Sequence, residues 1–180
     1  MKTRLAILTA WLLAALSARA ETVASPDGRF SVQAGPTLEV VDAAGQQLIL
    51  LDKDTARVRQ LEVSWSPDSH RVVLLEKTDH GSVVLAAWQT GATWHKAFQT
   101  DPMPGLTELV TRSGSRLVSE RRTLGHWLSE QAITMEGELR FADGSRHAYR
   151  YTLEFVSRPT PLERGGDEEG AIIGTHYQFE

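Results

Sequence analysis

The sequence predicts an all-β protein, and two observations support this prediction. After residue 20, apolar residues recur in short runs or in strict alternation, and the 3.6-residue period of an amphipathic helix is hard to find. The runs are separated by Gly, Pro and Asp residues, which are typical of tight turns. We expect an antiparallel meander that ends in a long β-hairpin, with a β-sandwich as the alternative arrangement.

The apolar runs define twelve expected strands, eleven of them in a single domain, residues 21–156. They lie at 29–33, 37–42, 46–51, 59–65, 71–77, 82–89, 93–98, 106–111, 115–122, 131–141, 145–156 and 171–179. Residues 157–170 are rich in Pro, Gly and charge, and are therefore expected to be a linker. The last segment, 171–180, is expected to return to the domain and pair with an early strand.

Residues 1–20 have the layout of a secretory signal peptide. Lys2 and Arg4 are followed by the mostly apolar run Leu5–Leu16, and Ala18-Arg19-Ala20 is a small-x-small cleavage site. The apolar run is too short to span a bilayer, so the mature chain is not expected to cross a membrane. The sequence therefore predicts a periplasmic or secreted protein. A buried N-terminal helix is the alternative.

Charge and cysteine content exclude several classes of function. Without residues 1–20, 16 of the 19 Lys and Arg residues remain against 23 Asp and Glu, a net charge of −7. This acidic balance argues against nucleic acid as a partner, because phosphate backbones are bound by clustered Lys and Arg. The chain has no cysteine, which excludes disulfides, thiolate catalysis and cysteine-bound metals.

A Ser-Pro-Asp turn occurs twice, 41 residues apart, as Ser25-Pro26-Asp27-Gly28 and as Ser66-Pro67-Asp68-Ser69. Proline suits the second position of a turn because its φ is already fixed, and aspartate favours turns because it bonds to nearby backbone. Each turn leads into a strand that is followed by two more strands. A repeat near forty residues with several strands in each unit is typical of propeller blades, so we expect propeller-like sheets.

These residues also resemble a known repeat. The segment 65–68, WSPD, followed by 71–74, RVVL, is similar to the W-S-P-D-G-[KR]-x-[IL]-[AV] repeat of TolB-type β-propellers. Residues 24–32 resemble it too, but lack the Trp, and the second copy has Ser69-His70 where the repeat has one Gly. The resemblance covers residues 25–98 and implies blade-like sheets that bind partners; it implies no particular ligand.

Residues 131–156 are expected to form the long hairpin, because apolar residues occupy odd positions on both arms. The expected dry face holds Ile133, Met135, Leu139, Phe141, Tyr149, Tyr151, Leu153 and Phe155; the polar Thr134, Glu136, Glu138 and Arg140 are expected on the wet face. A two-residue turn would set apolar residues opposite polar ones. The three-residue loop 142–144 restores the match and gives Gly144 the left-handed position. Tyr151 should then lie opposite Met135.

No local pattern of metal-binding or nucleophilic residues is present. The chain has six histidines, none of them in H-x-H or H-E-x-x-H spacing: His70, His80, His95, His126, His147 and His176. A metal site that contains His95, His126 and His147 would have to be assembled by the fold. Serine motifs such as G-x-S-x-G and S-x-x-K are absent. We therefore expect no metal and no cofactor, and the sequence identifies no catalytic residue.

The acidic residues have simpler explanations than catalysis. Alternation already explains Glu136 and Glu138 as solvated residues of the hairpin's wet face, although two carboxylates are able to hydrolyse glycosides. The runs 52–54 (DKD) and 167–169 (DEE) lack the twelve-residue ligand loop and closing Glu of a calcium site. They are expected to be solvated.

The tryptophans supply the predicted binding residues. Trp65 and Trp88 lie in strongly apolar runs and are expected in the core. Trp94 and Trp127 are flanked by polar residues, so they are expected to be exposed. Together with His95 and His126 they form the predicted contact surface, because tryptophan anchors many protein interfaces.

The favoured hypothesis is an exported, non-enzymatic β-protein that binds a protein or another component of the cell envelope. One alternative is a hydrolase whose site is assembled only by the fold, in a pocket that gathers His, Asp and Ser. Another is a structural subunit of an envelope assembly, in which an exposed edge of the long hairpin adds strands to a neighbour. The sequence predicts neither the partner nor the oligomeric state.

Overall fold

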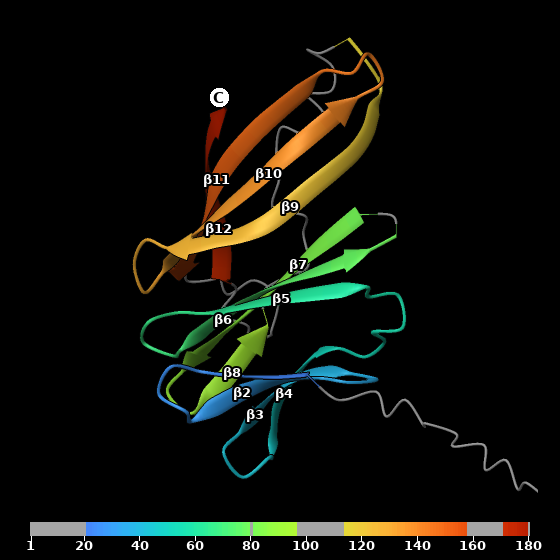
Figure 1. The fold of residues 1–180 in the computed structure, drawn as a ribbon. Coiled ribbons are helices and arrows are strands. Elements are labelled where there is room, and N and C mark those ends of the chain that lie inside the picture. Colours follow the sequence, from blue (N-terminus) through green and yellow to red (C-terminus); the bar gives the residue numbers. More distant parts are fainter. Residues whose placement is uncertain (1–20, 80, 97–113, 158–170, 180) are drawn as a thin grey trace, which may run out of the picture.

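The computed structural model describes residues 21–79, 81–96, 114–157 and 171–179. These residues form three four-stranded antiparallel sheets, and each sheet is a meander in which consecutive strands are neighbours. The sheets stack face to face, with the second sheet between the other two (Figure 1). The prediction of an all-β fold, in which an antiparallel meander is followed by a long hairpin, is confirmed.

The three sheets follow the order of the chain. Sheet A consists of β1 (Glu21–Ala24), β2 (Phe30–Ala34), β3 (Leu38–Asp42) and β4 (Gln47–Asp52). Sheet B consists of β5 (Gln60–Trp65), β6 (Arg71–Thr78), β7 (Gly81–Thr90) and β8 (Thr93–Lys96). Sheet C consists of β9 (Leu117–Trp127), β10 (Ala132–Phe141), β11 (Arg146–Ser157) and β12 (Ala171–Phe179).

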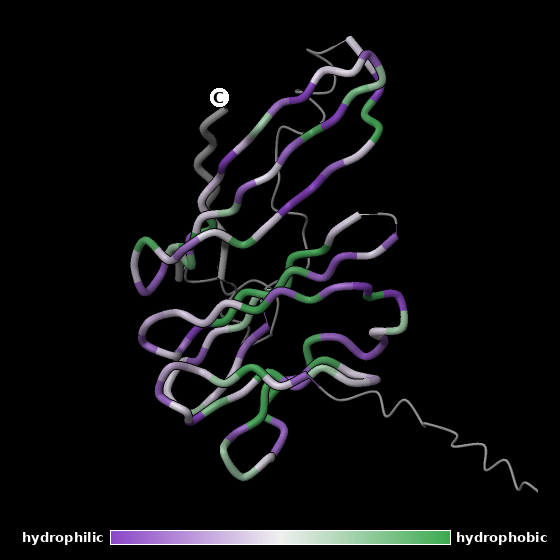
Figure 2. The backbone as a smooth tube through the Cα atoms, viewed as in Figure 1, coloured by the Kyte–Doolittle hydropathy of each residue, from purple (hydrophilic) through white to green (hydrophobic). Residues whose placement is uncertain are grey.

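Sheet B is apolar on both faces. On β6, Val72 and Leu74 belong to the core shared with sheet A, whereas Val73 and Leu75 belong to the core shared with sheet C. All four side chains are fully buried. Hydrophobic colouring is accordingly concentrated along the middle sheet, whereas β10 and β11 alternate between polar and apolar (Figure 2). A sheet with two dry faces requires a covering sheet on each side.

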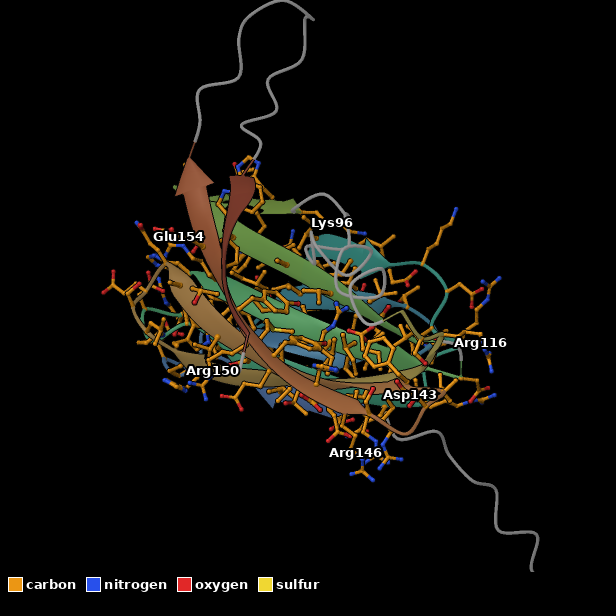
Figure 3. All side chains as sticks on the ribbon, turned by 90° about the horizontal axis from the view of Figure 1, so that it is seen from above. Lys96, Arg116, Asp143, Arg146, Arg150 and Glu154 are labelled. Atoms are coloured by element: carbon orange, nitrogen blue, oxygen red, sulfur yellow. The ribbon has the colours of Figure 1, made fainter. Side chains whose placement is uncertain are left out.

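The outer faces of sheets A and C are mostly polar, and the described stack ends at three sheets. The outer face of sheet A carries Ser31, Gln33 and Glu39, which are partly buried, and Val41, which is buried. On sheet C, Arg150 lies 2.9 Å from a Glu136 carboxylate oxygen across the β10–β11 pair. Arg146, Arg150 and Glu154 lie along β11, and Arg146 projects away from the sheet (Figure 3). These polar faces need no further sheet to cover them.

The two Ser-Pro-Asp turns have the same hydrogen bonds. In the first turn, Gly28 N donates to Ser25 O (3.0 Å) and Phe30 N to Ser25 Oγ (3.1 Å). In the second turn, Ser69 N donates to Ser66 O (2.9 Å), and the next strand donates to Ser66 Oγ in the same way. Gly28 and Ser69 both have positive φ, 71° and 63°.

The two turns also contact each other and thereby join sheets A and B. The Asp27 amide donates to Ser69 Oγ at 3.2 Å, and the Trp65 indole N–H donates to Val23 O at 3.1 Å. The Arg29 guanidinium lies 3.1 Å from the His70 ring. The repeated motif therefore forms two turns and also part of the contact between sheets A and B.

The hairpin loop has the predicted three residues. Phe141 N donates to Ser145 O and Gly144 N donates to Phe141 O, each at 3.0 Å, and Gly144 has a φ of 87°. Met135 lies directly opposite Tyr151, as predicted. The eight residues predicted for the dry face are all buried. Both arms are inner strands, however, because β9 pairs with β10 and β12 pairs with β11.

Thr134 does not lie on a wet face, contrary to the prediction; it is buried. A bulge in β9, between the residues that pair with Ile133 and Met135, folds the backbone of His126 over it. Thr134 Oγ1 accepts from His126 N (2.9 Å) and donates to His126 O (3.1 Å). Gly125 permits this approach, because a Cβ there would lie 2.2 Å from Thr134 Oγ1.

Several further predictions differ from the structure or fall outside the described residues. β12 pairs with β11 and not with an early strand. The four-residue β1 was not predicted, and β9 extends to residue 127, five residues beyond its expected end. The expected signal peptide, the strand at 106–111 and most of the linker lie outside the described residues.

Gly137 on β10 leaves room for the side chain of Tyr149, which extends from β11 across β10 to reach β9. Tyr149 lies opposite Gly137 on β11, and its hydroxyl donates to a Glu120 carboxylate oxygen on β9 at 2.6 Å. A Cβ at position 137 would lie 2.2 Å from the tyrosine ring and 2.5 Å from the Arg121 carbonyl oxygen. The ring is therefore held against bare backbone.

We expect Gly137→Ala to reduce the free energy of unfolding by about 1–3 kcal/mol, because the methyl group clashes with both ring and backbone. Urea unfolding would measure the loss. Gly35→Ala is the matched control, since Gly35 has no positive φ and open space around its Cβ. Equal unfolding midpoints for Gly137→Ala and the unmodified protein would contradict this account of the tyrosine.

Candidate functional site

The predicted binding residues do not form one surface. Trp94 was expected to be exposed, but it is 7% exposed and belongs to the core between sheets A and B. Its ring packs edge-on against Phe30 and Trp65, at centroid distances of 5.2 and 5.9 Å. The expectation failed because successive side chains of a strand alternate between its faces, so Thr93 and His95 on the short edge strand β8 lie on the face opposite to Trp94. Trp65 and Trp88 are buried, as predicted.

Of the other three predicted residues, His126 and Trp127 belong to sheet C, and His95 lies on the face of sheet B that is turned toward sheet C. His95 stacks on Trp88, which belongs to the core between sheets B and C, at 5.4 Å. Trp127 is half-buried, stacks on Phe155, and donates its indole N–H to Ser64 Oγ at 3.0 Å. His126 is exposed in the β9 bulge. A role of any of these residues in binding stays a prediction.

Among the described residues, no three His, Cys, Asp or Glu side chains are grouped so that they could hold a metal ion. His95, His126 and His147 are on three different strands, and His147 packs edge-on against Phe141 at 5.4 Å. Folding therefore does not assemble these three histidines.

Glu76, on β6, is a buried titratable group with an oxygen atom that accepts no hydrogen bond among the described residues. It continues the series Val72 and Leu74 that faces sheet A, with Leu61 and Val83 as its neighbours on the adjoining strands. Its side chain is 3% exposed, and its Oε1 has no hydrogen-bond partner among the described residues. A buried carboxyl without a partner is costly, so it needs an explanation.

Two charged groups from other strands surround Glu76. The pKa of Glu76 is raised to about 7. Burial is the largest cause, the nearby Asp52 on β4 also raises it, partly through a hydrogen bond between the two carboxyls, and Lys96 on β8 lowers it. Lys96 also donates to Leu51 O on β4, and so ties sheets A and B together. Glu76 therefore keeps its proton up to about neutral pH, because burial and a neighbouring carboxyl both disfavour its charged form.

Glu76 lines a cavity of about 780 Å³ between sheets A and B, which we call the A–B cavity. Its apolar wall consists of Ala34, Pro36, Leu38, Val58 and Leu61. Its polar lining includes Glu21, Thr55, Arg59 and Glu76, whereas Asp52 is not part of the lining.

Two other polar side chains of the A–B cavity, Arg59 and Thr55, are already bonded. The Arg59 guanidinium donates three hydrogen bonds of 2.7–3.1 Å to the Asp79 carboxylate, and these raise its pKa. The Thr55 hydroxyl donates to Gly35 O. Glu76 is therefore the buried group of this lining that has hydrogen-bonding capacity to spare.

A second cavity, of about 680 Å³, lies between sheets B and C and is lined by Lys77, Asp79, Glu120 and Arg122, among others. Its buried ion pair is satisfied: Arg122 donates to a Glu120 carboxylate oxygen at 2.6 and 2.9 Å. Burial opposes the charge of Arg122, but Tyr151, Glu120 and Tyr149 outweigh it and raise its pKa. This cluster has the form of a structural ion pair, and Lys77 pairs with Glu62.

Sequence reasoning missed Glu76 and Asp52. The available signal was the position of Glu76 in the run 71–77, RVVLLEK, where it occupies the same face as Val72 and Leu74. A carboxyl in phase with buried residues of an inner strand is a candidate buried acid. Nothing local connects it with Asp52, which comes from another sheet.

No family model, curated protein or solved structure matches this chain. The resemblance to TolB-type repeats therefore rests on the two turn motifs alone. The described part of the chain holds no helix long and apolar enough to cross a membrane.

We expect Glu76→Gln to change how stability depends on pH. The pKa of Glu76 rises from 4.5 to about 7 on folding, so between these values the folded chain holds a proton that the unfolded chain has lost. The free energy of unfolding should therefore fall as the pH rises from 4.5 to 7, by at most about 3 kcal/mol. Glutamine cannot ionise, so the variant should lack this fall and be the more stable protein above pH 7.

Urea unfolding across this pH range would measure the effect. Glu39→Gln is the matched control, because it removes a carboxyl from the outer, polar face of sheet A. Parallel stability curves for Glu76→Gln and the unmodified protein would contradict a proton on Glu76.

Proposed function

We propose that the protein is an exported, non-enzymatic β-protein that binds a protein or another component of the cell envelope, and that it does so through the A–B cavity. The leader-like pattern of residues 1–20 supports export, with a periplasmic or secreted location. The cavity has the size and the lining of a binding site, with an apolar wall and a few convergent polar groups.

The observation that carries this proposal is the unpartnered Oε1 of Glu76. Glu76 is 3% exposed, and its Oε1 is buried without a hydrogen-bond partner among the described residues. Such a group lowers stability by roughly 1–3 kcal/mol unless something pairs with it. Because it lines a cavity of about 780 Å³, a bound partner has room to supply that bond.

Strand addition at the long hairpin is not part of the proposal. That hypothesis required an exposed hairpin edge, but β10 and β11 are each paired on both sides. The edges of sheet C are β9 and β12.

A hydrolase is the second candidate, favoured by one observation. A carboxyl with a pKa of about 7 is suited to general acid–base catalysis at neutral pH. However, Asp52 does not line the cavity, so the pair does not present two carboxyls to a substrate. Glycoside hydrolysis requires two carboxyls roughly 5–9.5 Å apart, whereas these two are in hydrogen-bond contact.

We expect Ala34→Phe to abolish partner capture, because Ala34 lines the cavity and a phenyl ring would fill it. The full sequence, expressed with a C-terminal tag, would be purified from the envelope fraction, and the retained proteins quantified by mass spectrometry. The same analysis should find Glu21 at the N-terminus. Loss of an interface anchor predicts roughly a tenfold or greater fall in a retained partner.

Gln33→Phe is the matched control, since it adds the same ring to the neighbouring residue on the outer face of β2. Thermal unfolding would show that both variants fold. Equal capture by the two variants, or no specific partner at all, would contradict binding of an envelope component at the A–B cavity.

A further inference from the structure

We infer that the A–B cavity binds an alkylammonium group, with Glu76 Oε1 as the acceptor of its N–H bonds and the apolar wall around its alkyl chain. This inference rests on the proposed function only for the choice of cavity. The same chemistry has two sources, a lysine side chain of a partner protein and a small free amine.

The hydrogen-bonding capacity of Glu76 favours a donor as ligand. An ionised carboxylate only accepts hydrogen bonds, and Oε1 is buried without a donor among the described residues. A ligand carboxylate or phosphate would place like charge beside Glu76 and Asp52. A neutral hydroxyl would supply a hydrogen bond, but it would leave the buried charge uncompensated.

The charges around the cavity favour a cationic donor. The groups that face Glu76 are Asp52 from β4, Lys96 from β8, and Glu21 and Arg59 in the lining. Arg59 is held by Asp79, and the Lys96 ammonium donates to Leu51 O outside the lining. The cavity therefore presents carboxyls without a free cation of its own among the described residues.

The apolar wall explains why the cation should carry an alkyl chain. Leu38, Val58 and Leu61 line the same cavity as Glu76, so methylene groups beside the ammonium would be removed from water. Each buried methylene contributes roughly 0.8 kcal/mol to transfer from water, and lysine and alkylamines combine such a chain with an ammonium head.

Binding of the ammonium is coupled to a proton. The cation stabilises the ionised form of Glu76, so below pH 7 the carboxyl must release its proton as the ammonium binds, and the ammonium keeps its own. Affinity depends on the ionised fraction of Glu76. It should therefore fall roughly tenfold between about pH 8 and about pH 6.

Isothermal titration calorimetry of the folded protein tests the inference with hexylamine and its uncharged analogue hexan-1-ol. A second pair of probes is the peptide acetyl-Ala-Leu-Lys-Leu-Ala-amide and its norleucine analogue, which lacks the ammonium. Measurements at about pH 6 in two buffers of different ionisation enthalpy count the protons released. The expected result is that hexylamine, the lysine peptide, or both bind with proton release, and that their uncharged analogues bind at least roughly tenfold more weakly.

Glu76→Gln should remove both the preference for ammonium and the proton release, whereas Glu39→Gln, on the outer face of sheet A, should change neither. Binding of hexylamine alone would identify small amines as ligands, and binding of the peptide would identify lysine side chains. Equal binding of charged and uncharged probes, no binding of either ammonium probe, or unchanged binding by Glu76→Gln would overturn the inference.

These outcomes separate the inference from the proposed function. Capture of an envelope partner that depends on the cavity, without any preference for ammonium, would retain the function and overturn the ligand class. Ammonium binding without any envelope partner would retain the ligand class and overturn the function.

Discussion

Sheet B has to be covered on both faces, and the rest of the structure depends on this constraint. Its inner strands place fully buried side chains on either side, with Val72 and Leu74 toward sheet A and Val73 and Leu75 toward sheet C. Sheets A and C each pack one apolar face on sheet B, and their outer faces are mostly polar. The paired Ser-Pro-Asp turns and the Trp65 indole hold sheet A in place. The described fold is therefore an open stack of three sheets.

The same constraint creates the candidate site. The face that places Val72 and Leu74 in the core also places Glu76 there, two residues farther along β6, where the apolar packing gives way to a cavity. Burial and Asp52 then hold a proton on the carboxyl near neutral pH. The ion pairs of sheet C, by contrast, are satisfied, whether on its outer surface or at Arg122. Glu76 differs from these ion pairs because it is buried, lacks a partner for Oε1 among the described residues, and lines a cavity with room for a ligand.

Local sequence patterns predicted much of the fold and little of the site. Parity along the hairpin was enough to predict the loop at 142–144 and the pairing of Met135 with Tyr151, because strand geometry is a short-range property. β1 is too short to show a pattern, although the 41-residue repeat aligns it with the end of β5. The burial of Trp94 and the contact between Glu76 and Asp52 depend on how two sheets pack, and neighbouring residues do not encode that packing.

The most direct test of this account is the titration of the Glu76 side-chain carboxyl, followed by carbon NMR in the unmodified protein and in Asp52→Asn. We expect a midpoint near pH 7 in the unmodified protein and a lower midpoint in Asp52→Asn, because Asp52 raises the pKa of Glu76. A midpoint near 4.5 in both proteins would mean that Glu76 is solvated like an ordinary surface carboxyl. That result would contradict both the buried proton and the candidate site built on it.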